Sequence, residues 1–309
     1  MREHSLPCLG SNGFHRIAYT EWGEPDNPRI VICVHGLTRN RHDFDHLAAR
    51  LSGEFRVVAM DVAGRGDSEW LEDKADYRFG QYKADAAALI ARITAPRASS
   101  WVDRVRGHSR PPPTQIDWVG TSMGGLIGML LAAQRNTPIR RLVLNDVGPM
   151  VPWPGLMRLS GNAAHPRIFD SMDAVVSHLR EACASFGALS DEQWHYLALH
   201  GSRELPDGRL ALSYDPDIAR GLRSGSALDI PRGERLLEGI DLWALWDRLR
   251  CPTLVLRGAE SDVLTARIAA EMLARAPATR LLELPGVGHA PALMDTAQTE
   301  PIRDFLRSV

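Results

Sequence analysis

The segment with the clearest chemical signature is Gly-Thr-Ser-Met-Gly at residues 120–124. It follows an apolar run that starts at Ile116 and precedes a stretch with helical periodicity. A serine in a sharp strand-to-helix turn presents its hydroxyl to solvent, and flanking glycines allow the close backbone approach that the turn needs. The pattern predicts Ser122 as a nucleophile. The Met123 amide, at the start of the helix, is predicted to donate to an anion forming beside it.

A serine hydroxyl becomes a good nucleophile only when a base takes its proton, so a histidine and a carboxylate are expected later in the chain. The apolar run 280–284 leads into a glycine-rich loop at 285–291 that holds one histidine, His289. We expect this residue to be the general base. Other histidines, such as His42 and His178, are interpreted as surface or structurally satisfied residues.

The predicted acid is Asp262, in the loop that follows the buried strand expected at 251–258. Its role would be to hold the tautomer of the base histidine and to stabilise the imidazolium. Glu260 in the same loop and Asp146 after the preceding strand also keep the order serine, acid, histidine. For Asp146 we expect instead a hydrogen bond that fixes its loop.

A second amide donor for a tetrahedral intermediate is expected after the buried strand at 29–34, in the loop that begins His35-Gly36-Leu37. Gly36 would allow the backbone to approach the serine, which makes the Leu37 amide the predicted partner of the Met123 amide. No second ligand lies at helical or hairpin spacing from His35, so neither a metal site nor a cofactor is predicted. We expect His35 to fix the loop through hydrogen bonds.

Taken together, these motifs resemble those of the α/β-hydrolase superfamily, on its esterase and lactonase side. The residues that carry the resemblance are the elbow at 120–124, His35-Gly36, the turn at 61–68, the segment 142–146 and Gly288-His289. The resemblance implies an α/β fold with a mostly parallel eight-stranded sheet flanked by helices, and a helical lid after the sixth strand. It also implies that Ser122, His289 and Asp262 form a catalytic triad.

The alternation of strand and helix patterns stops near residue 146 and resumes near 252, which indicates a parallel sheet with an insertion. We expect the core at 1–147 and 247–309 and the helical lid at 148–246, with helical periodicity at 173–180 and 191–197. The apolar start of the lid either packs on the edge of the sheet as core of the lid or contacts the substrate. In the second case Trp153, Leu156 and Met157 are candidate walls of a largely apolar substrate pocket.

Residues 95–115 are rich in arginine and proline and are expected to form a solvated loop. This loop leads into the start of a parallel strand, on the side of the sheet away from the site, and we exclude it from catalysis.

Composition excludes several classes of protein. A net charge of -2 over 309 residues offers no electrostatic footprint for nucleic acid. The first residues lack the apolar stretch of a secretory signal, and no run is long and apolar enough to span a membrane, so a cytoplasmic protein is expected. The cysteines at positions 8, 33, 183 and 251 are widely spaced and predicted to be reduced thiols. The oligomeric state is left open, and a homodimer is allowed.

Three classes of function are compatible with these residues. The first is hydrolysis of a small or medium carboxylic ester, thioester or lactone through an acyl-serine intermediate. The second is cleavage of a carbon–carbon bond, or perhydrolysis, with the same triad. The third is a small-molecule receptor with a vestigial triad. A serine at the elbow disfavours the branches of the superfamily that use aspartate there.

Overall fold

The computed structural model describes residues 1–95, 115–163, 167–219, 238–276 and 278–308. Apart from its two end residues, the arginine- and proline-rich segment predicted as a loop at 95–115 lies outside the described residues.

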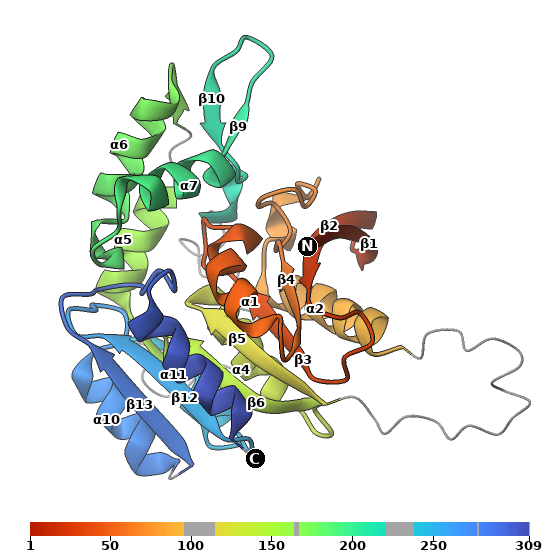
Figure 1. Cartoon of the computed structure of the whole chain (residues 1–309), viewed down its shortest axis with the longest axis vertical. Coiled ribbons are helices and arrows are strands. Elements are labelled where there is room, and N and C mark those ends of the chain that lie inside the picture. Colours follow the sequence, from red (N-terminus) through yellow and green to blue (C-terminus); the bar gives the residue numbers. More distant parts are fainter. Residues whose placement is uncertain (96–114, 164–166, 220–237, 277, 309) are drawn as a thin grey trace, which may run out of the picture.

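The centre of the molecule is an eight-stranded sheet in the order β1-β2-β4-β3-β5-β6-β12-β13 (Figure 1). The pairs β1–β2 and β2–β4 are antiparallel, whereas every other neighbouring pair is parallel. The expected eight-stranded, mostly parallel sheet is therefore confirmed. In chain order its strands are β1 (Arg2–Gly10), β2 (Gly13–Trp22), β3 (Ile30–Val34), β4 (Arg56–Met60), β5 (Ile116–Thr121), β6 (Ile139–Asn145), β12 (Thr253–Gly258) and β13 (Thr279–Leu284).

The central strands are almost continuously apolar because both faces of the sheet are covered. All five residues of β3 are buried. Ile30, Ile32 and Val34 belong to the hydrophobic core on one face. Val31 and Cys33 belong to the core on the other face, as the two-residue period of a strand requires.

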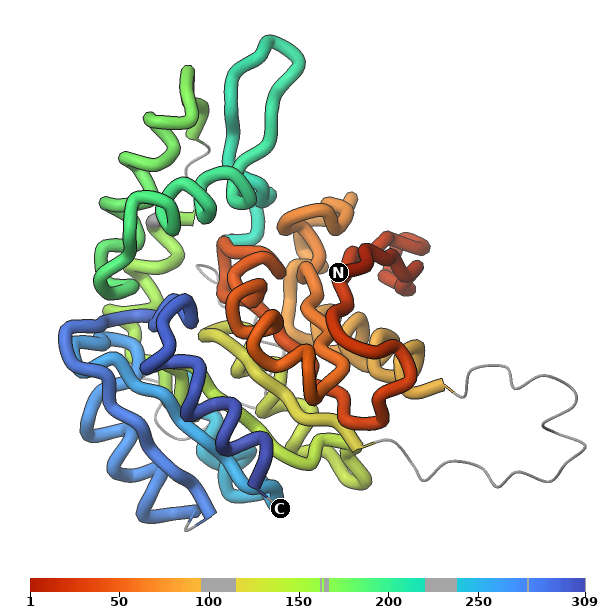
Figure 2. Tube along the Cα trace, in the orientation of Figure 1, coloured from red at the N-terminus to blue at the C-terminus, as the bar shows by residue number. Residues whose placement is uncertain are grey.

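Helices cover both faces (Figures 1 and 2). On one face lie α1 (Asp45–Leu51), after the short helix η1 (Arg41–Phe44), and the C-terminal helix α11 (Thr296–Arg307). The other face is covered by α2 (Phe79–Thr94), α4 (Met123–Ala132), α9 (Trp243–Trp246) and α10 (Ala266–Arg275). A single turn of helix, η2 (Lys74–Asp76), precedes α2.

The chain between β6 and α9, called the insertion below, rises above the carboxyl ends of the parallel strands (Figure 1). The two helices expected at 173–180 and 191–197 are present as α6 and α7. The short strands were not expected: β8, β10 and β9 form a small sheet, and β7 pairs with β11. The described elements are β7 (Met150–Pro152), α5 (Trp153–Ala163), β8 (Ile168–Phe169), α6 (Met172–Ala182), η3 (Ala184–Phe186), α7 (Asp191–Gly201), β9 (Ser202–Glu204), β10 (Leu210–Leu212), η4 (Pro216–Ala219) and β11 (Gly239–Asp241).

The insertion has a small core of its own, to which α6 and α7 contribute Val175, Leu179 and Trp194. Ala292 and Met294, from the loop before α11, complete this core and attach the insertion to the sheet domain.

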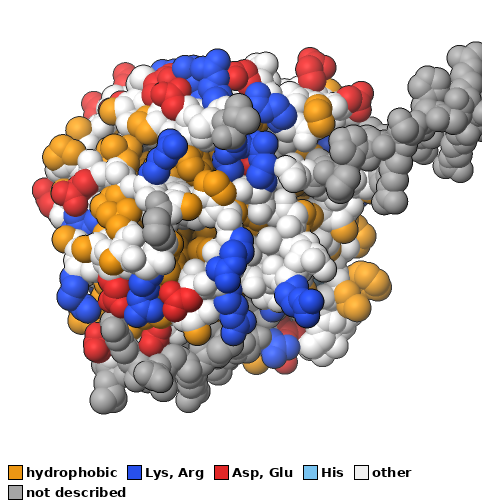
Figure 3. All heavy atoms as spheres, turned by 90° about the horizontal axis from the view of Figure 1, so that it is seen from below, with side chains coloured by type: hydrophobic (Ala, Val, Ile, Leu, Met, Phe, Trp, Pro, Cys, Tyr) orange, Lys and Arg blue, Asp and Glu red, His pale blue; other side chains and the backbone are white. Residues whose placement is uncertain are grey.

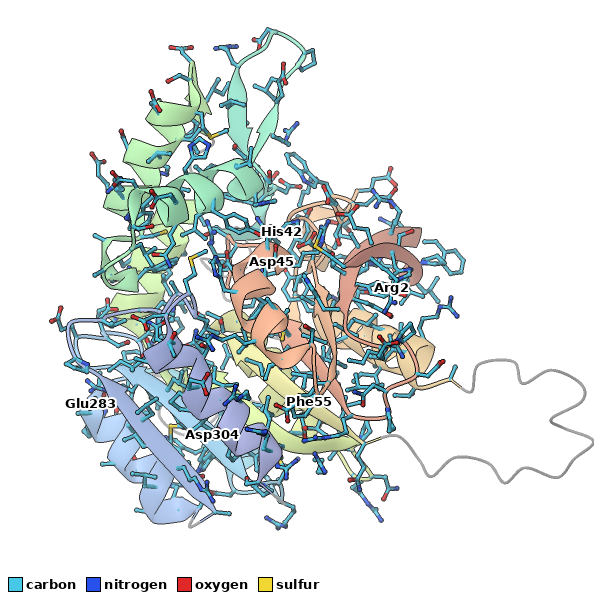
Figure 4. All side chains as sticks on the ribbon, viewed as in Figure 1. Arg2, His42, Asp45, Phe55, Glu283 and Asp304 are labelled. Carbon is cyan, nitrogen blue, oxygen red and sulfur yellow. The ribbon has the colours of Figure 1, made fainter. Side chains whose placement is uncertain are left out.

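A second attachment lies at α1, where Figure 4 labels His42 and Asp45. The Tyr196 hydroxyl of α7 donates to Asp45, and the rings of His42 and His200 stack with their centroids 4.1 Å apart. The insertion is thus fixed to the core at two places, the loop before α11 and the segment formed by η1 and α1.

On the face seen in Figure 3, basic and acidic side chains are interspersed with hydrophobic ones. None of the helices in the described part of the chain combines the length and the apolar character that crossing a bilayer requires.

Candidate active site

The turn between β5 and α4 holds Ser122 in a strained conformation, with φ 50° and ψ -113°. A Cβ on Gly120 would lie 2.4 Å from backbone atoms of Gly124, and one on Gly124 would lie 2.0 Å from the carbonyl oxygen of Val34. Real side chains do not tolerate such distances, so glycine is required at both positions. The close packing of strand and helix pushes the intervening serine out of the sheet, as the sequence pattern predicts.

Loops from three strands meet at the carboxyl edge of the sheet. Ser122 follows β5 and Asp146 follows β6, and the last residues of these strands, Thr121 and Asn145, are paired in register. His289 lies in the loop after β13. In parallel sheets of this kind, ligands bind outside the carboxyl ends of the strands, so the fold brings these loops to the expected position for a site.

The three side chains form a continuous chain of hydrogen bonds. His289 Nε2 lies 2.9 Å from Ser122 Oγ, and His289 Nδ1 lies 2.7 Å from Asp146 Oδ2. Because a carboxylate only accepts, the Nδ1 atom carries the hydrogen and Nε2 is left to accept from the serine hydroxyl. This tautomer is the one that a general base for Ser122 needs.

Asp146 is fully buried, and its carboxylate accepts three hydrogen bonds. Besides His289, it accepts from the Gly258 amide at 2.8 Å and from the Ser261 hydroxyl at 2.5 Å. Ser261 Oγ in turn accepts from the Val263 and Leu264 amides. The loop after β12 therefore supports Asp146 through a serine and does not supply the carboxylate that is bonded to His289.

The prediction of Asp262 as the partner of His289 is wrong on this geometry. The Asp262 side chain is 46% exposed and accepts two hydrogen bonds from Arg158 of α5, at 2.6 and 2.8 Å. The adjacent Ser261 turns inward while Asp262 turns outward. Asp146 has a positive φ of 55°, which aims its side chain inward from the end of β6.

The loop after β3 lies beside the serine. A Cβ placed on Gly36 would be 3.8 Å from Ser122 Cβ. His35 fixes the loop as expected, because its Nδ1 donates to the Gly36 carbonyl at 2.7 Å and its Nε2 accepts from the Val62 amide at 3.0 Å. Burial lowers the pKa of His35 to about 3, so the ring is neutral. Leu37, which follows Gly36, lines the two cavities that Ser122 also lines.

Arg65 lies behind both residues that are predicted to supply oxyanion amides. It is fully buried, its Nε donates to the Leu37 carbonyl at 2.9 Å, and its Nη2 lies 3.6 Å from Met123 Sδ. Further hydrogen bonds join Nη1 to the Ala63 carbonyl and the Tyr82 hydroxyl. Sequence reasoning included Arg65 in the 61–68 motif but gave it no role, because only the tertiary structure brings it to the two loops.

Two cavities open from Ser122. The apolar cavity has Leu156 in its wall, as predicted. Trp153 packs against the hydrophobic core instead, and Met157 is 55% exposed, so neither of these two expected wall residues lines the described cavities at Ser122. Besides Leu156, the residues that line the apolar cavity are Leu37, Tyr77, Phe79, Tyr82, Ser122, Met123, Leu126, Val147, Val151, Leu159, Ile218, Ile240 and Val263.

The second cavity, called the arginine-lined cavity below, contains both Ser122 and His289. Arg39 and Arg158 are in its wall. His178, which the sequence analysis interpreted as a surface or structurally satisfied residue, lines it as well. Cys183 also lines it, but burial raises the pKa of this thiol to about 11, which keeps it protonated and unreactive at neutral pH. The remaining lining residues are Gly36, Leu37, Thr38, Thr121, Leu159, Leu179, Ala182, Phe186, Gly201, Leu212, Tyr214 and Ala290.

The insertion also holds the histidine loop. The Ser185 hydroxyl donates to the His289 carbonyl at 2.5 Å, and the Gly288 amide donates to the Ser185 carbonyl at 2.8 Å. From the other side, the Asn145 side chain donates to the Pro291 carbonyl at 2.8 Å. The position of the His289 ring therefore depends on contacts with both the insertion and β6.

Comparison with known proteins places this geometry in context. A family model described as the alpha/beta hydrolase family matches residues 31–302. The 3-hydroxybutyrate-oligomer hydrolase of Cupriavidus necator is 41% identical over 296 residues, which cover 95% of this chain and 93% of that protein. The pimeloyl-(acyl-carrier protein) methyl ester esterase of Neisseria meningitidis serogroup B is 26% identical over 283 residues, 91% of this chain and 94% of that protein.

Among solved structures, the crystal structure of an alpha/beta hydrolase from Novosphingobium aromaticivorans is similar, with a TM-score of 0.78 and 33% identity. The match covers 99% of each chain. The similarity extends over the insertion as well as the sheet domain, because no large part of either chain is left out.

Proposed function

Because the chain belongs to the alpha/beta hydrolase family, we propose that it is a serine hydrolase that cleaves carboxylic esters. The observation that carries the proposal is the hydrogen-bonded series Ser122, His289 and Asp146 at the carboxyl edge of the sheet. The relatives named as esterases and hydrolases support ester hydrolysis as the type of reaction.

In the proposed mechanism His289 Nε2 takes the proton of Ser122 as Oγ attacks the ester carbonyl. The negative charge on the carbonyl oxygen is stabilised by the amides of Leu37 and Met123. His289 then gives the proton to the leaving alcohol, and the acyl group remains on Ser122. Water, activated by the same histidine, attacks the acyl-serine and releases the acid.

Asp146 has the role of orienting residue in this proposal. It holds the Nδ1 hydrogen of His289 and stabilises the imidazolium that forms at each proton transfer. Its own position is fixed by the Gly258 amide and by Ser261. Residues 148–246, which contain the described elements of the insertion, act as the lid over the core formed by 1–147 and 247–309.

For the substrate we propose short oligomers of a 3-hydroxyacid. This part rests on the Cupriavidus necator relative, which is named for hydrolysis of 3-hydroxybutyrate oligomers and matches almost the whole chain. Ser122 lines two cavities, and the proposal places one arm of the substrate in each.

The test is turnover of a 3-hydroxybutyrate dimer and of a p-nitrophenyl ester series by the wild type and Ser122→Ala. We expect Ser122→Ala to lose turnover of both while its melting temperature stays close to that of the wild type. An organophosphate probe should label Ser122, located by peptide mass. Ser52→Ala is the control, because it also removes one serine hydroxyl, which bonds only to the Ala49 carbonyl of its own helix and lines neither cavity at Ser122.

Wild-type protein that is inert toward all these esters would overturn the proposal. Activity on a dienoic ketone would then point to carbon–carbon cleavage, and release of nitrophenol that stops after one equivalent would point to a receptor.

A further inference from the structure

The arginine-lined cavity contains two guanidinium groups that come from opposite walls. Arg39 lies in the loop after β3 and is 8% exposed. Arg158 lies on α5 of the insertion, with a side chain that is 39% exposed. The described residues that line this cavity include no aspartate or glutamate.

Both arginines are anchored in the same way, by a carboxylate behind the cavity wall. Asp43 accepts from Nε and Nη2 of Arg39, at 3.0 and 2.6 Å. Asp262 accepts from Nε and Nη2 of Arg158. Neither aspartate lines the arginine-lined cavity. A guanidinium has five N–H donors, and a pair of this kind fixes its plane while the Nη1 donors stay outside the pair.

The other cavity at Ser122 has the opposite character. Its described lining consists of apolar and aromatic side chains and the catalytic serine, with no charged residue. An ester bond at Ser122 therefore lies between an apolar space and a space walled by two fixed cations.

We infer that the enzyme selects esters that carry a free carboxylate on the arm lying in the arginine-lined cavity, and that Arg158, together with Arg39, binds this carboxylate. Planar guanidinium groups recognise carboxylates with geometric specificity. The inference rests on the proposed function, and it refines the substrate class to acid-terminated esters with a short apolar second arm. A linear hydroxyacid oligomer has such a carboxylate at one end.

The experiment compares two substrates that differ only at this end: the 3-hydroxybutyrate dimer with a free carboxylate, and its methyl ester. Cleavage of the internal ester is followed by chromatography for the wild type, Arg158→Met and Arg167→Met. Arg167 is a matched control. It lines a further pocket that Arg158 and His289 also line, but it does not line the arginine-lined cavity.

For the wild type we expect kcat/KM to favour the acid over the methyl ester. In Arg158→Met, KM for the acid should rise about tenfold or more, the size of effect expected for loss of a hydrogen bond to a charged group. KM for the methyl ester should stay within about twofold, and Arg167→Met should keep the preference of the wild type. Equal kcat/KM for the two substrates in the wild type, or an unchanged preference in Arg158→Met, would overturn the inference.

Binding separates the inference from the proposed function. With Ser122→Ala, which cannot turn the substrate over, calorimetry should give tighter binding of the acid than of the methyl ester, and Arg158→Met in the same background should remove the difference. Hydrolysis of both substrates without preference would leave the proposed function standing and refute the inference. Failure to hydrolyse any ester would refute the proposed function.

Discussion

Replacing Asp146 by asparagine should nearly abolish turnover. The new amide is almost the same size as the carboxylate, and its oxygen can still accept from the Gly258 amide. The NH2 group of the asparagine then takes the place of the carboxylate oxygen that, in the wild type, accepts from the Ser261 hydroxyl and from His289 Nδ1. The hydroxyl can rotate, but the imidazole must move its hydrogen from Nδ1 to Nε2.

A hydrogen on Nε2 points at Ser122 Oγ, 2.9 Å away, so the ring can no longer accept the serine proton. In a comparable serine–histidine–aspartate triad, this change lowers kcat by about 10⁴-fold. That factor corresponds to roughly 5.4 kcal/mol of transition-state stabilisation. We expect a loss of similar size here, with a modest fall in melting temperature.

Asp262→Asn is the internal comparison, because Asp262 is the other carboxylate that the sequence pattern favoured. Its carboxylate contacts Arg158, half-exposed to solvent, and such surface pairs contribute about 0 to 1 kcal/mol. Turnover of a neutral p-nitrophenyl ester by this variant should stay within about threefold of the wild type. The assay is kcat at saturating ester for both variants, with melting temperatures to exclude unfolding. A near-normal kcat in Asp146→Asn together with loss of turnover in Asp262→Asn would refute the assignment of Asp146 as the partner of His289.

Three further predictions concern residues around the site and in the core. Arg65→Met should lower kcat roughly tenfold or more while KM stays within about twofold, because Arg65 contacts Leu37 and Met123, whose amides we propose as the oxyanion donors; equal losses in both parameters would argue for a purely structural role. Ser185→Ala should reduce kcat severalfold with little change in melting temperature, since it frees the His289 carbonyl; unchanged kcat would show that the insertion does not position the ring. The hydrogen bond that the His15 ring donates to the Asp85 carboxylate, partly opposed by burial, raises the pKa of His15. The pair therefore stabilises the fold fully below about pH 6.5 and loses this contribution as pH rises through the raised pKa, so the melting-temperature gap between wild type and His15→Gln should shrink from pH 6 to 9. A gap that widens over this range would contradict the assignment.

What the sequence determines is local. The glycines around Ser122 are required by contacts within one strand, one turn and the adjacent backbone, and a five-residue pattern is enough to predict them. The buried strands and the helices α6 and α7 follow in the same way, from runs and periodicities of apolar residues. His289 could be predicted because one histidine lies in a glycine-rich loop after the last strand, and that loop must end at the same edge of the sheet as the serine.

The choice between Asp146 and Asp262 was decided only by the tertiary structure. Both follow strands of the same sheet and both precede the histidine, so chain order and spacing fit either. Asp146 turns inward and Asp262 turns outward because of the backbone angles at the strand ends and because of one partner each. Asp146 bonds to Ser261, which is far from it in sequence, and Asp262 bonds to Arg158, which belongs to the insertion. The same holds for Arg65 behind the oxyanion loops and for Arg39 and Arg158 in the cavity wall, since each acquires its role from partners that no local pattern connects.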